Sequence, residues 1–255
     1  MKRPSFKLLA LLGGLGLLAA CGAPYEDGPS RGATPEMYDV LTDGDITLPA
    51  VPVEYLDEPN RRAAVKYDGP EAPGSIVVDP YAKFLYLVED GGNATRYPIA
   101  VGREGRGFKG SASIRRKEEW PGWAPTANML RTEPEVYGPF AGGIPGGVAS
   151  PLGARALYLY RGGRDTRYRI HGTNDLASIG NSSTAGCIRM FNQDVIDLYN
   201  RTPMGTDVVV RTYEESVAAE GEAMANRGVE LPPTIVDPEV IYAAVEAQEA
   251  KNTTE

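Results

Sequence analysis

Glycine and proline are frequent in this sequence, and they limit how long its helices and strands can be. With 30 Gly and 21 Pro, the two types make up 51 of the 255 residues, or 20%. Gly weakens helices and Pro interrupts both helices and strands, so the sequence favours short strands joined by many turns. Hydrophobic residues at 42% and charged residues at 24% are typical of a globular protein.

The charge balance and the scarcity of His and Cys exclude several classes of protein. Acidic residues outnumber basic ones by 34 to 26, whereas a nucleic-acid-binding protein usually has a basic surface. One His and two Cys argue against zinc fingers, His-rich zinc sites and disulfide scaffolds. We therefore expect no nucleic-acid partner and no metal site, although an all-oxygen calcium site would need neither residue type.

The first 20 residues are predicted to be a signal peptide. A basic start is followed by an uncharged run over residues 8–20, which is shorter than the ~20 apolar residues that span a bilayer. The run ends at Leu18-Ala19-Ala20-Cys21-Gly22, which resembles a bacterial lipobox. The resemblance implies a lipid on Cys21 and a periplasmic protein held to a membrane. Gly22 is not the Asp of an inner-membrane retention signal, which favours the outer membrane. The alternative is ordinary cleavage beside an incidental Cys.

Composition divides the rest of the chain into three segments. Residues 21–74 are acidic and rich in Pro, and are predicted to be a tether whose later part lies on the domain surface. Residues 75–212 contain the strand signals and are predicted to be the main domain. Residues 213–255 are rich in Ala and Glu and are predicted to be a helical extension, with Asp237 and Pro238 starting its last helix.

The main domain is predicted to be mainly β, with one or two short helices. Short apolar runs separated by turn residues mark the strands, and the pairs Gly91-Gly92 and Gly162-Gly163 mark two hairpin turns. A helix is expected over 192–199, with Asn192 as its cap. Helical segments do not separate the strands, which excludes a βαβ arrangement. The expected strands are 75–79, 83–88, 96–101, 113–116, 156–160, 168–171 and 208–210.

The sole His and the sole thiol left after lipidation of Cys21 lie 16 positions apart, at His171 and Cys187. A cysteine thiol has a pKa of about 8.5, so it is mostly protonated at neutral pH. An adjacent imidazole can accept that proton, and the resulting thiolate can attack a carbonyl. The alternatives are a buried, inert Cys and a structural His at a strand end.

A longer pattern surrounds the two residues. It runs Ile170-His171-Gly172-Thr173-Asn174, then Ser178-Ile179-Gly180, then Thr184-Ala185-Gly186-Cys187-Ile188-Arg189-Met190. This pattern resembles the catalytic motif of the YkuD-type L,D-transpeptidase family. Further blocks between residues 75 and 212 resemble its longer periplasmic members. The motif often has His where this sequence has Ala185, but the residue that matches the family's catalytic base, His171, is present.

The resemblance implies a β-sandwich or mixed-sheet catalytic domain that needs neither a metal nor an organic cofactor. It implies that Cys187 is the nucleophile, His171 the general base and acid, and the Gly172 carbonyl the group that orients the imidazole. Gly186 would allow close approach of the substrate, and the Cys187 amide would stabilise the oxyanion.

Residues that bind substrate are harder to identify from sequence. Arg189 is a candidate anchor for a substrate carboxylate, with a structural ion pair as the alternative. Thr184 is a candidate hydrogen-bonding residue in the loop. Trp123, with Trp120 and Tyr137, is a candidate wall of the substrate groove, although aromatic residues are more often part of a core.

The resemblance implies that peptidoglycan stem peptides are the substrate class. The enzyme would release D-Ala from a stem tetrapeptide and transfer the acyl group to an amine, which makes a 3–3 cross-link or anchors an acceptor lipoprotein. Two alternatives stay open: hydrolysis of the same bond, as in a carboxypeptidase, and a non-catalytic wall-binding lipoprotein.

Overall fold

The structure is a computed structural model that describes residues 34–102, 110–183 and 187–252. The predicted signal peptide, Cys21, Thr184 and Gly186 lie outside the described residues. In the part of the chain that is described, no helix combines the length and the apolar character that crossing a membrane requires.

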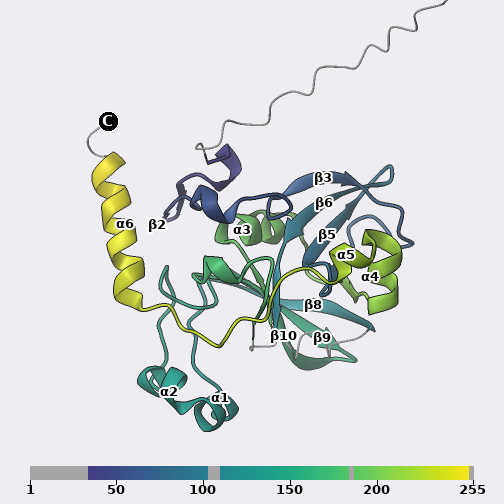
Figure 1. Ribbon diagram of the computed structural model, residues 1–255. Coiled ribbons are helices and arrows are strands. Elements are labelled where there is room, and N and C mark those ends of the chain that lie inside the picture. Colours follow the sequence, from purple (N-terminus) through teal and green to yellow (C-terminus); the bar gives the residue numbers. More distant parts are fainter. Residues whose placement is uncertain (1–33, 103–109, 184–186, 253–255) are drawn as a thin grey trace, which may run out of the picture. The chain divides into compact units, whose positions relative to one another are not determined.

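Within the described ranges, eleven strands form one mixed sheet, which confirms the mainly β prediction (Figure 1). The strand order is β11-β7-β12-β10-β9-β8-β13-β4-β5-β6-β3. Strands β12, β7 and β13 pair in parallel with β10, β11 and β4, and the other pairs are antiparallel. The bounds are β3 Ala63–Lys66, β4 Ile76–Asp79, β5 Phe84–Glu89, β6 Asn93–Pro98, β7 Ala100–Gly102, β8 Gly110–Glu119, β9 Arg155–Arg161, β10 Arg164–Gly172, β11 Ser182–Ser183, β12 Ile188–Met190 and β13 Asp207–Val210.

The sheet curves around its main apolar core. Leu85 of β5 belongs to the same buried cluster as Val101 of β7 and Ile188 of β12, although these strands come from opposite ends of the sheet order. Only Ile99 separates β6 from β7, so one short segment carries the chain from one end of the order to the other. The strand predicted over 96–101 is therefore two strands, and the single sheet encloses its core as a sandwich does.

The two predicted hairpin turns are confirmed. Gly91 and Gly92 join β5 to β6, and Gly162 and Gly163 join β9 to β10. All four have positive φ, between 55° and 77°. Tight hairpin turns require this backbone conformation, and Gly adopts it without steric cost.

Helices lie on both sides of the strand region (Figure 1). The predicted helix 192–199 is α3, but Asn192 does not cap it, since Phe191 holds the cap position without a side-chain hydrogen bond. The predicted start of the last helix is confirmed, because Asp237 Oδ1 accepts the Glu239 N–H at 3.0 Å. The bounds are α1 Ala127–Thr132, α2 Pro134–Tyr137, α3 Asn192–Arg201, α4 Tyr213–Glu220, α5 Glu222–Ala225 and α6 Pro238–Asn252.

The segment before the main domain is folded, which differs from a tether over residues 34–66. It contains the 3-10 helices η1 (Glu36–Tyr38) and η2 (Val53–Tyr55) and the hairpin strands β1 (Leu41–Asp43) and β2 (Ile46–Leu48), and it ends in β3 of the large sheet. Tyr38, Leu48, Val51 and Leu56 are buried. Two acidic residues have basic partners, Asp43 with Arg155 and Glu58 with Arg96. The sequence does not show those partners because they lie far along the chain.

Asp43 is the clearest example of such a long-range contact. Both of its carboxylate oxygens accept hydrogen bonds from Arg155, at 2.7 and 2.8 Å, and Trp120 Nε1 donates to Oδ2 at 2.8 Å. These bonds hold the β1–β2 hairpin against β9 and the end of β8. A charge pair of this kind, 112 positions apart in sequence, can only be recognised once the fold is known.

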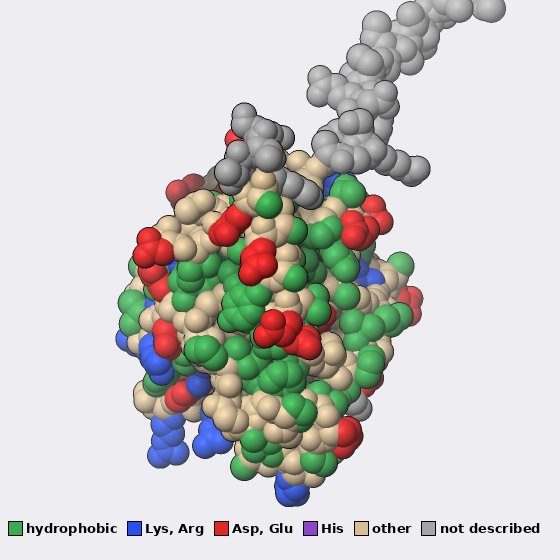
Figure 2. Space-filling model, turned by 90° about the vertical axis from the view of Figure 1, so that its left-hand side faces the viewer, with side chains coloured by type: hydrophobic (Ala, Val, Ile, Leu, Met, Phe, Trp, Pro, Cys, Tyr) green, Lys and Arg blue, Asp and Glu red, His purple; other side chains and the backbone are tan. Residues whose placement is uncertain are grey.

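Helix α6 packs beside this hairpin. Ile241 and Val245 contact the main core cluster, while Val240 and Tyr242 point outward and are 60% and 44% exposed. Figure 2 shows the side of the molecule that carries α6, where acidic side chains are interspersed among hydrophobic ones. The helical extension is thus partly integrated into the fold.

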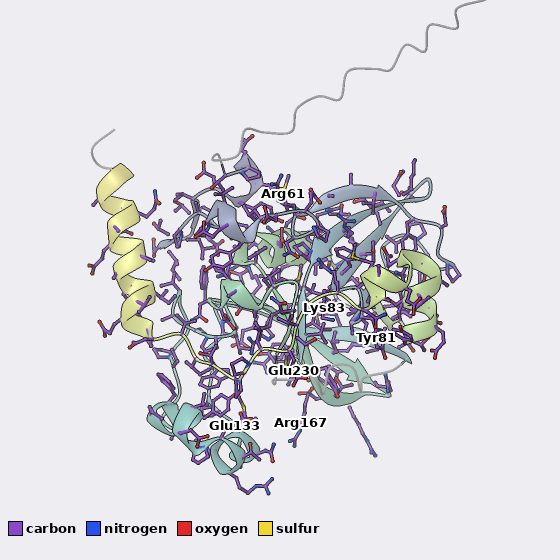
Figure 3. All side chains as sticks on the ribbon, in the orientation of Figure 1. Arg61, Tyr81, Lys83, Glu133, Arg167 and Glu230 are labelled. Carbon is purple, nitrogen blue, oxygen red and sulfur yellow. The ribbon has the colours of Figure 1, made fainter. Side chains whose placement is uncertain are left out.

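The chain between α5 and α6 runs beside β11. The Ser182 N–H donates to the Val229 carbonyl at 2.9 Å, and the Leu231 N–H donates to the Ser182 carbonyl at 2.8 Å. Glu230, labelled in Figure 3, lies between these two bonds near the middle of the molecule. The extension therefore covers the outer edge of the strand that leads toward Cys187.

Candidate active site

The predicted base lies on β10, and the predicted nucleophile directly precedes the neighbouring strand β12. In the parallel pair of β10 and β12, His171 lies opposite Arg189. Cys187 comes directly before β12 and is half-buried. Ile170 and Ile188 point into the main core, so His171 and Arg189 occupy the other face of the sheet, since side chains alternate along a strand. The fold-back expected between His171 and Cys187 is thus a strand crossover within one sheet.

The imidazole of His171 is held in one orientation by its own neighbour. Nδ1 lies 2.5 Å from the carbonyl oxygen of Gly172, and the residue is only 4% exposed. A carbonyl can only accept, so Nδ1 carries the proton and Nε2 keeps its lone pair. This is the arrangement that a general base needs, with Gly172 in the place expected for it.

Burial keeps the imidazole neutral. Loss of water lowers the pKa of His171 to about 3, and the positive charge of Arg189 acts in the same direction. Hydrogen bonds to the backbone of Gly172 and of Leu152 oppose the effect but are weaker. At neutral pH the ring is therefore uncharged.

Arg189 forms an ion pair within the protein. Its Nη1 lies 3.1 Å from Oδ2 of Asp175, and the two side chains are 14% and 15% exposed. Asp175 belongs to the segment between His171 and Cys187. The structural alternative noted for Arg189 is therefore present, and the guanidinium also lies next to the base in the sheet register.

The aromatic candidates lie in different surroundings. The Trp120 side chain is half-buried, packs against the main core and donates a hydrogen bond to Asp43. Trp123 pairs with Ile144 at the base of the long β8–β9 connection, and its ring centroid is 6.3 Å from that of Tyr137. Trp123 is half-buried and Tyr137 is buried, so Trp123 is the more accessible member of this pair.

Two residues near the base were not identified from sequence. Asp175 pairs with Arg189, and Asn192 bonds to the backbone on both sides of the site. The sequence did single out Asn192, but as a helix cap, because it is a polar residue followed by an apolar helical pattern. Its true contacts depend on the loop that ends at Ala154, 38 positions away.

The sequence was compared with the profiles of known protein families. The profile of the YkuD family, described as the L,D-transpeptidase catalytic domain, matches residues 73–210. The chain belongs to this L,D-transpeptidase family. The match includes His171, Cys187 and Arg189, and it leaves the residues before 73 and after 210 outside the family domain.

Individual relatives carry the same family name. The probable L,D-transpeptidase YbiS of Escherichia coli K12 is 32% identical over 159 residues, which are 61% of this chain and 50% of YbiS. The probable L,D-transpeptidase ErfK/SrfK of Salmonella typhimurium is 34% identical over 151 residues, 57% of this chain and 47% of the relative. The chain thus spans about half the length of these curated relatives.

A solved structure from Brucella melitensis, described as a probable carnitine operon oxidoreductase, is 49% identical to this L,D-transpeptidase family member. The alignment covers 62% of this chain and 98% of that protein, with a TM-score of 0.42.

Proposed function

We propose that this protein is a peptidoglycan L,D-transpeptidase in which Cys187 is the nucleophile and His171 the general base. The observation that carries the proposal is the parallel pairing of β10 with β12, which sets the strand containing His171 beside the strand that Cys187 precedes. Family membership supports the same class of reaction. The proposed substrate is a stem tetrapeptide.

The first half-reaction forms a thioester. Sγ of Cys187 attacks the carbonyl carbon of the bond between the L-centre of the diamino acid at position three and D-Ala at position four. The thiol proton passes to Nε2 of His171 as the C–S bond forms, and the Cys187 N–H donates to the developing oxyanion. The imidazolium then protonates the nitrogen of D-Ala, the C–N bond breaks, and D-Ala leaves.

The second half-reaction depends on the group that attacks the thioester. An amine nitrogen attacks the acyl carbon and His171 accepts its proton. The C–S bond then breaks, and the imidazolium returns the proton to the sulfur, which restores the thiol of Cys187. The diamino acid of another stem gives a 3–3 cross-link, and the Lys of a lipoprotein gives an anchored protein. Water gives a carboxypeptidase instead.

The neutral imidazole indicates when the proton moves. With a pKa of about 3, His171 does not hold a proton at neutral pH in its buried position beside Arg189. An imidazolium is favoured only once a negative charge forms next to it. Proton transfer to Nε2 therefore accompanies attack by the sulfur.

The substrate-binding roles follow from chemistry and position. Arg189 binds a stem-peptide carboxylate, which would share the guanidinium with Asp175. Trp123 contributes an accessible aromatic surface at the base of the β8–β9 connection. Thr184 supplies a hydrogen bond and Gly186 leaves room for the substrate, but both lie outside the described residues.

The test is D-Ala exchange on a tetrapeptide, combined with intact-mass analysis after exposure to a carbapenem. The wild-type protein is expected to exchange D-Ala and to gain a covalent adduct, and both Cys187→Ala and His171→Ala are expected to abolish exchange. Turnover in either variant would remove the dyad from the mechanism. Products measured with and without an added amine distinguish transfer from hydrolysis, and an unreactive wild-type thiol would indicate a non-catalytic wall-binding lipoprotein.

For localisation, we propose a periplasmic lipoprotein anchored through Cys21, in the outer membrane rather than the inner one. The proposal rests on the lipobox-like sequence around Cys21. Metabolic labelling with a fatty acid is expected to mark the wild-type chain, and Cys21→Ser is expected to remove the label and release the protein from membranes. Label that persists in the variant would contradict anchoring at this residue.

A further inference from the structure

Asn192 joins two backbone segments that meet at the imidazole. It is the first residue of α3, and only 7% of it is exposed. Its Oδ1 accepts the N–H of Ala154 at 2.9 Å, and its Nδ2 donates to the carbonyl of Thr173 at 3.2 Å. The side chain thus connects α3 to the loop before β9 and to the end of β10.

One of the two segments carries the backbone group that bonds to His171. The Gly172 carbonyl, 2.5 Å from Nδ1, is one residue before Thr173. The other segment lies near the ring, since the backbone of Leu152, two residues before Ala154, influences the pKa of His171. The amide of Asn192 therefore fixes the main chain one residue from the Gly172 carbonyl and two residues from Leu152.

Two glycines make the room for this side chain. A Cβ on Gly172 would lie 2.2 Å from Oδ1 of Asn192, and a Cβ on Gly153 would lie at the same distance from that atom. Real Cβ contacts are never this short, so neither glycine can be replaced while the amide stays in place. The absence of side chains at these two positions and the presence of Asn192 are parts of one packing arrangement.

Only an amide satisfies both ends of the gap. Ala154 offers a donor and Thr173 an acceptor, so the side chain between them must present an acceptor at one end and a donor at the other. Asp has the same shape but presents an acceptor to the Thr173 carbonyl, which is repulsive. Ala leaves both buried backbone groups without this partner.

We propose that Asn192 is a positioning residue for His171. It holds the Gly172 carbonyl in line with Nδ1, which keeps the proton on Nδ1 and leaves Nε2 as the proton acceptor. The catalytic consequence rests on the proposed function, whereas the effect on the imidazole does not. The inference therefore assigns to α3 a role in preparing the base, through bonds that do not touch substrate.

The sequence contains a single His, which allows a direct test. The mature chain, purified with a tag that contains no His, is labelled with ¹⁵N-histidine, and the two ring-nitrogen resonances are measured at neutral pH. Wild type is expected to show protonated Nδ1 and unprotonated Nε2. Asn192→Asp is expected to move the two resonances toward each other, as in a mixture of tautomers.

Gln193→Glu is the matched control. Gln193 is the next residue of α3, is 6% exposed, and donates from Nε2 to the Pro49 carbonyl at 3.0 Å, away from His171. The control makes the same change from amide to carboxylate at a similarly buried site, and its imidazole resonances are expected to match wild type. Wild-type resonances in folded Asn192→Asp, or an equal change in Gln193→Glu, would overturn the proposal. If Asn192→Asp does not fold, Asn192→Ala replaces it with the same expected result.

A second readout links the imidazole to the thiol. The rate at which a carbapenem acylates Cys187 is expected to fall about tenfold to hundredfold in Asn192→Asp, because small errors in the placement of a catalytic group reduce rates by such factors. Gln193→Glu is expected to keep the wild-type rate. If wild type itself does not react, the proposed function fails while the resonances still decide the role of Asn192. A wild-type rate in Asn192→Asp would show that the positioning has no catalytic consequence.

Discussion

The guanidinium of Arg189 lies 3.1 Å from the carboxylate of Asp175, and this pair joins the segment after β10 to strand β12. Arg189 also lies opposite His171 in the strand register. One cation thus pairs with the chain segment between His171 and Cys187, and it also lowers the pKa of His171.

Removing that cation is expected to raise the pKa of His171. In Arg189→Gln the unfavourable charge next to the imidazole is gone, so the protonated ring costs less. An NMR titration of the single His measures this directly. Arg116→Gln, at an exposed arginine on β8, is the control and is expected to leave the titration unchanged. An unaltered or lower pKa in Arg189→Gln would contradict the electrostatic role of Arg189.

His171 is expected to make the folded state sensitive to acid. The ordinary pKa of a histidine is 6.5, and the pKa of His171 in the folded protein is about 3, so between these values the unfolded chain binds a proton that the folded protein does not. This contribution to stability is fully present above pH 6.5 and is lost as the pH falls toward 3, with a slope of up to about 1.4 kcal/mol per pH unit. Urea unfolding of wild type and His171→Gln between pH 4 and 7 measures it. Parallel pH profiles for the two proteins would show that the imidazole is not held neutral.

Much of the strand pattern could be predicted because it depends on residues that are close together in the sequence. The apolar run at 75–79 and the glycine pairs at 91–92 and 162–163 lead to the strands and turns that the structure contains. A sole His and a sole mature thiol also stand out in the sequence as a candidate dyad, whose catalytic role stays a prediction. Contacts between distant segments could not be predicted, because nothing in the sequence identifies Asp43 and Arg155 as partners.

Missing knowledge of long-range contacts also explains why the predictions for the tether and for Asn192 differ from the structure. An acidic, Pro-rich segment has the composition of a solvated linker, and the sequence alone does not show that Tyr38 is fully buried against α3. Likewise, a polar residue at the start of a helix usually caps it, and only the position of the loop at Ala154 reveals a different partner. In both cases tertiary contacts override the local preference.

Tyr38 is expected to contribute to stability through Asp194. Its hydroxyl donates to Oδ2 of that buried carboxylate at 3.0 Å, and burial raises the pKa of Asp194 to about 7. Tyr38→Phe is expected to cost about 1–3 kcal/mol, since it removes a hydrogen bond from a buried polar group. A carboxyl whose folded-state pKa is raised loses stability as the pH rises through that pKa, and losing the donor raises it further. The cost is therefore expected to be larger at pH 8 than at pH 5.

Denaturant unfolding at the two pH values measures the effect of Tyr38→Phe. Tyr242→Phe is the matched control, because its side chain is 44% exposed on α6, and it is expected to stay within about 0.5 kcal/mol of wild type. Equal losses in the two variants, or a loss that does not depend on pH, would mean that Tyr38 acts only through packing.

The segment between α5 and α6 is expected to stabilise β11 through its backbone. The N–H of Leu231 donates to the Ser182 carbonyl, and proline has no N–H, so Leu231→Pro removes this bond. We expect faster hydrogen exchange at the Ser182 amide, which is bonded to Val229 on the same segment, and a stability loss of about 1 kcal/mol. Thr234→Pro, further along the segment, is expected to change neither quantity. If Ser182 exchanges at the wild-type rate in Leu231→Pro, the extension lies on the edge of the sheet without supporting it.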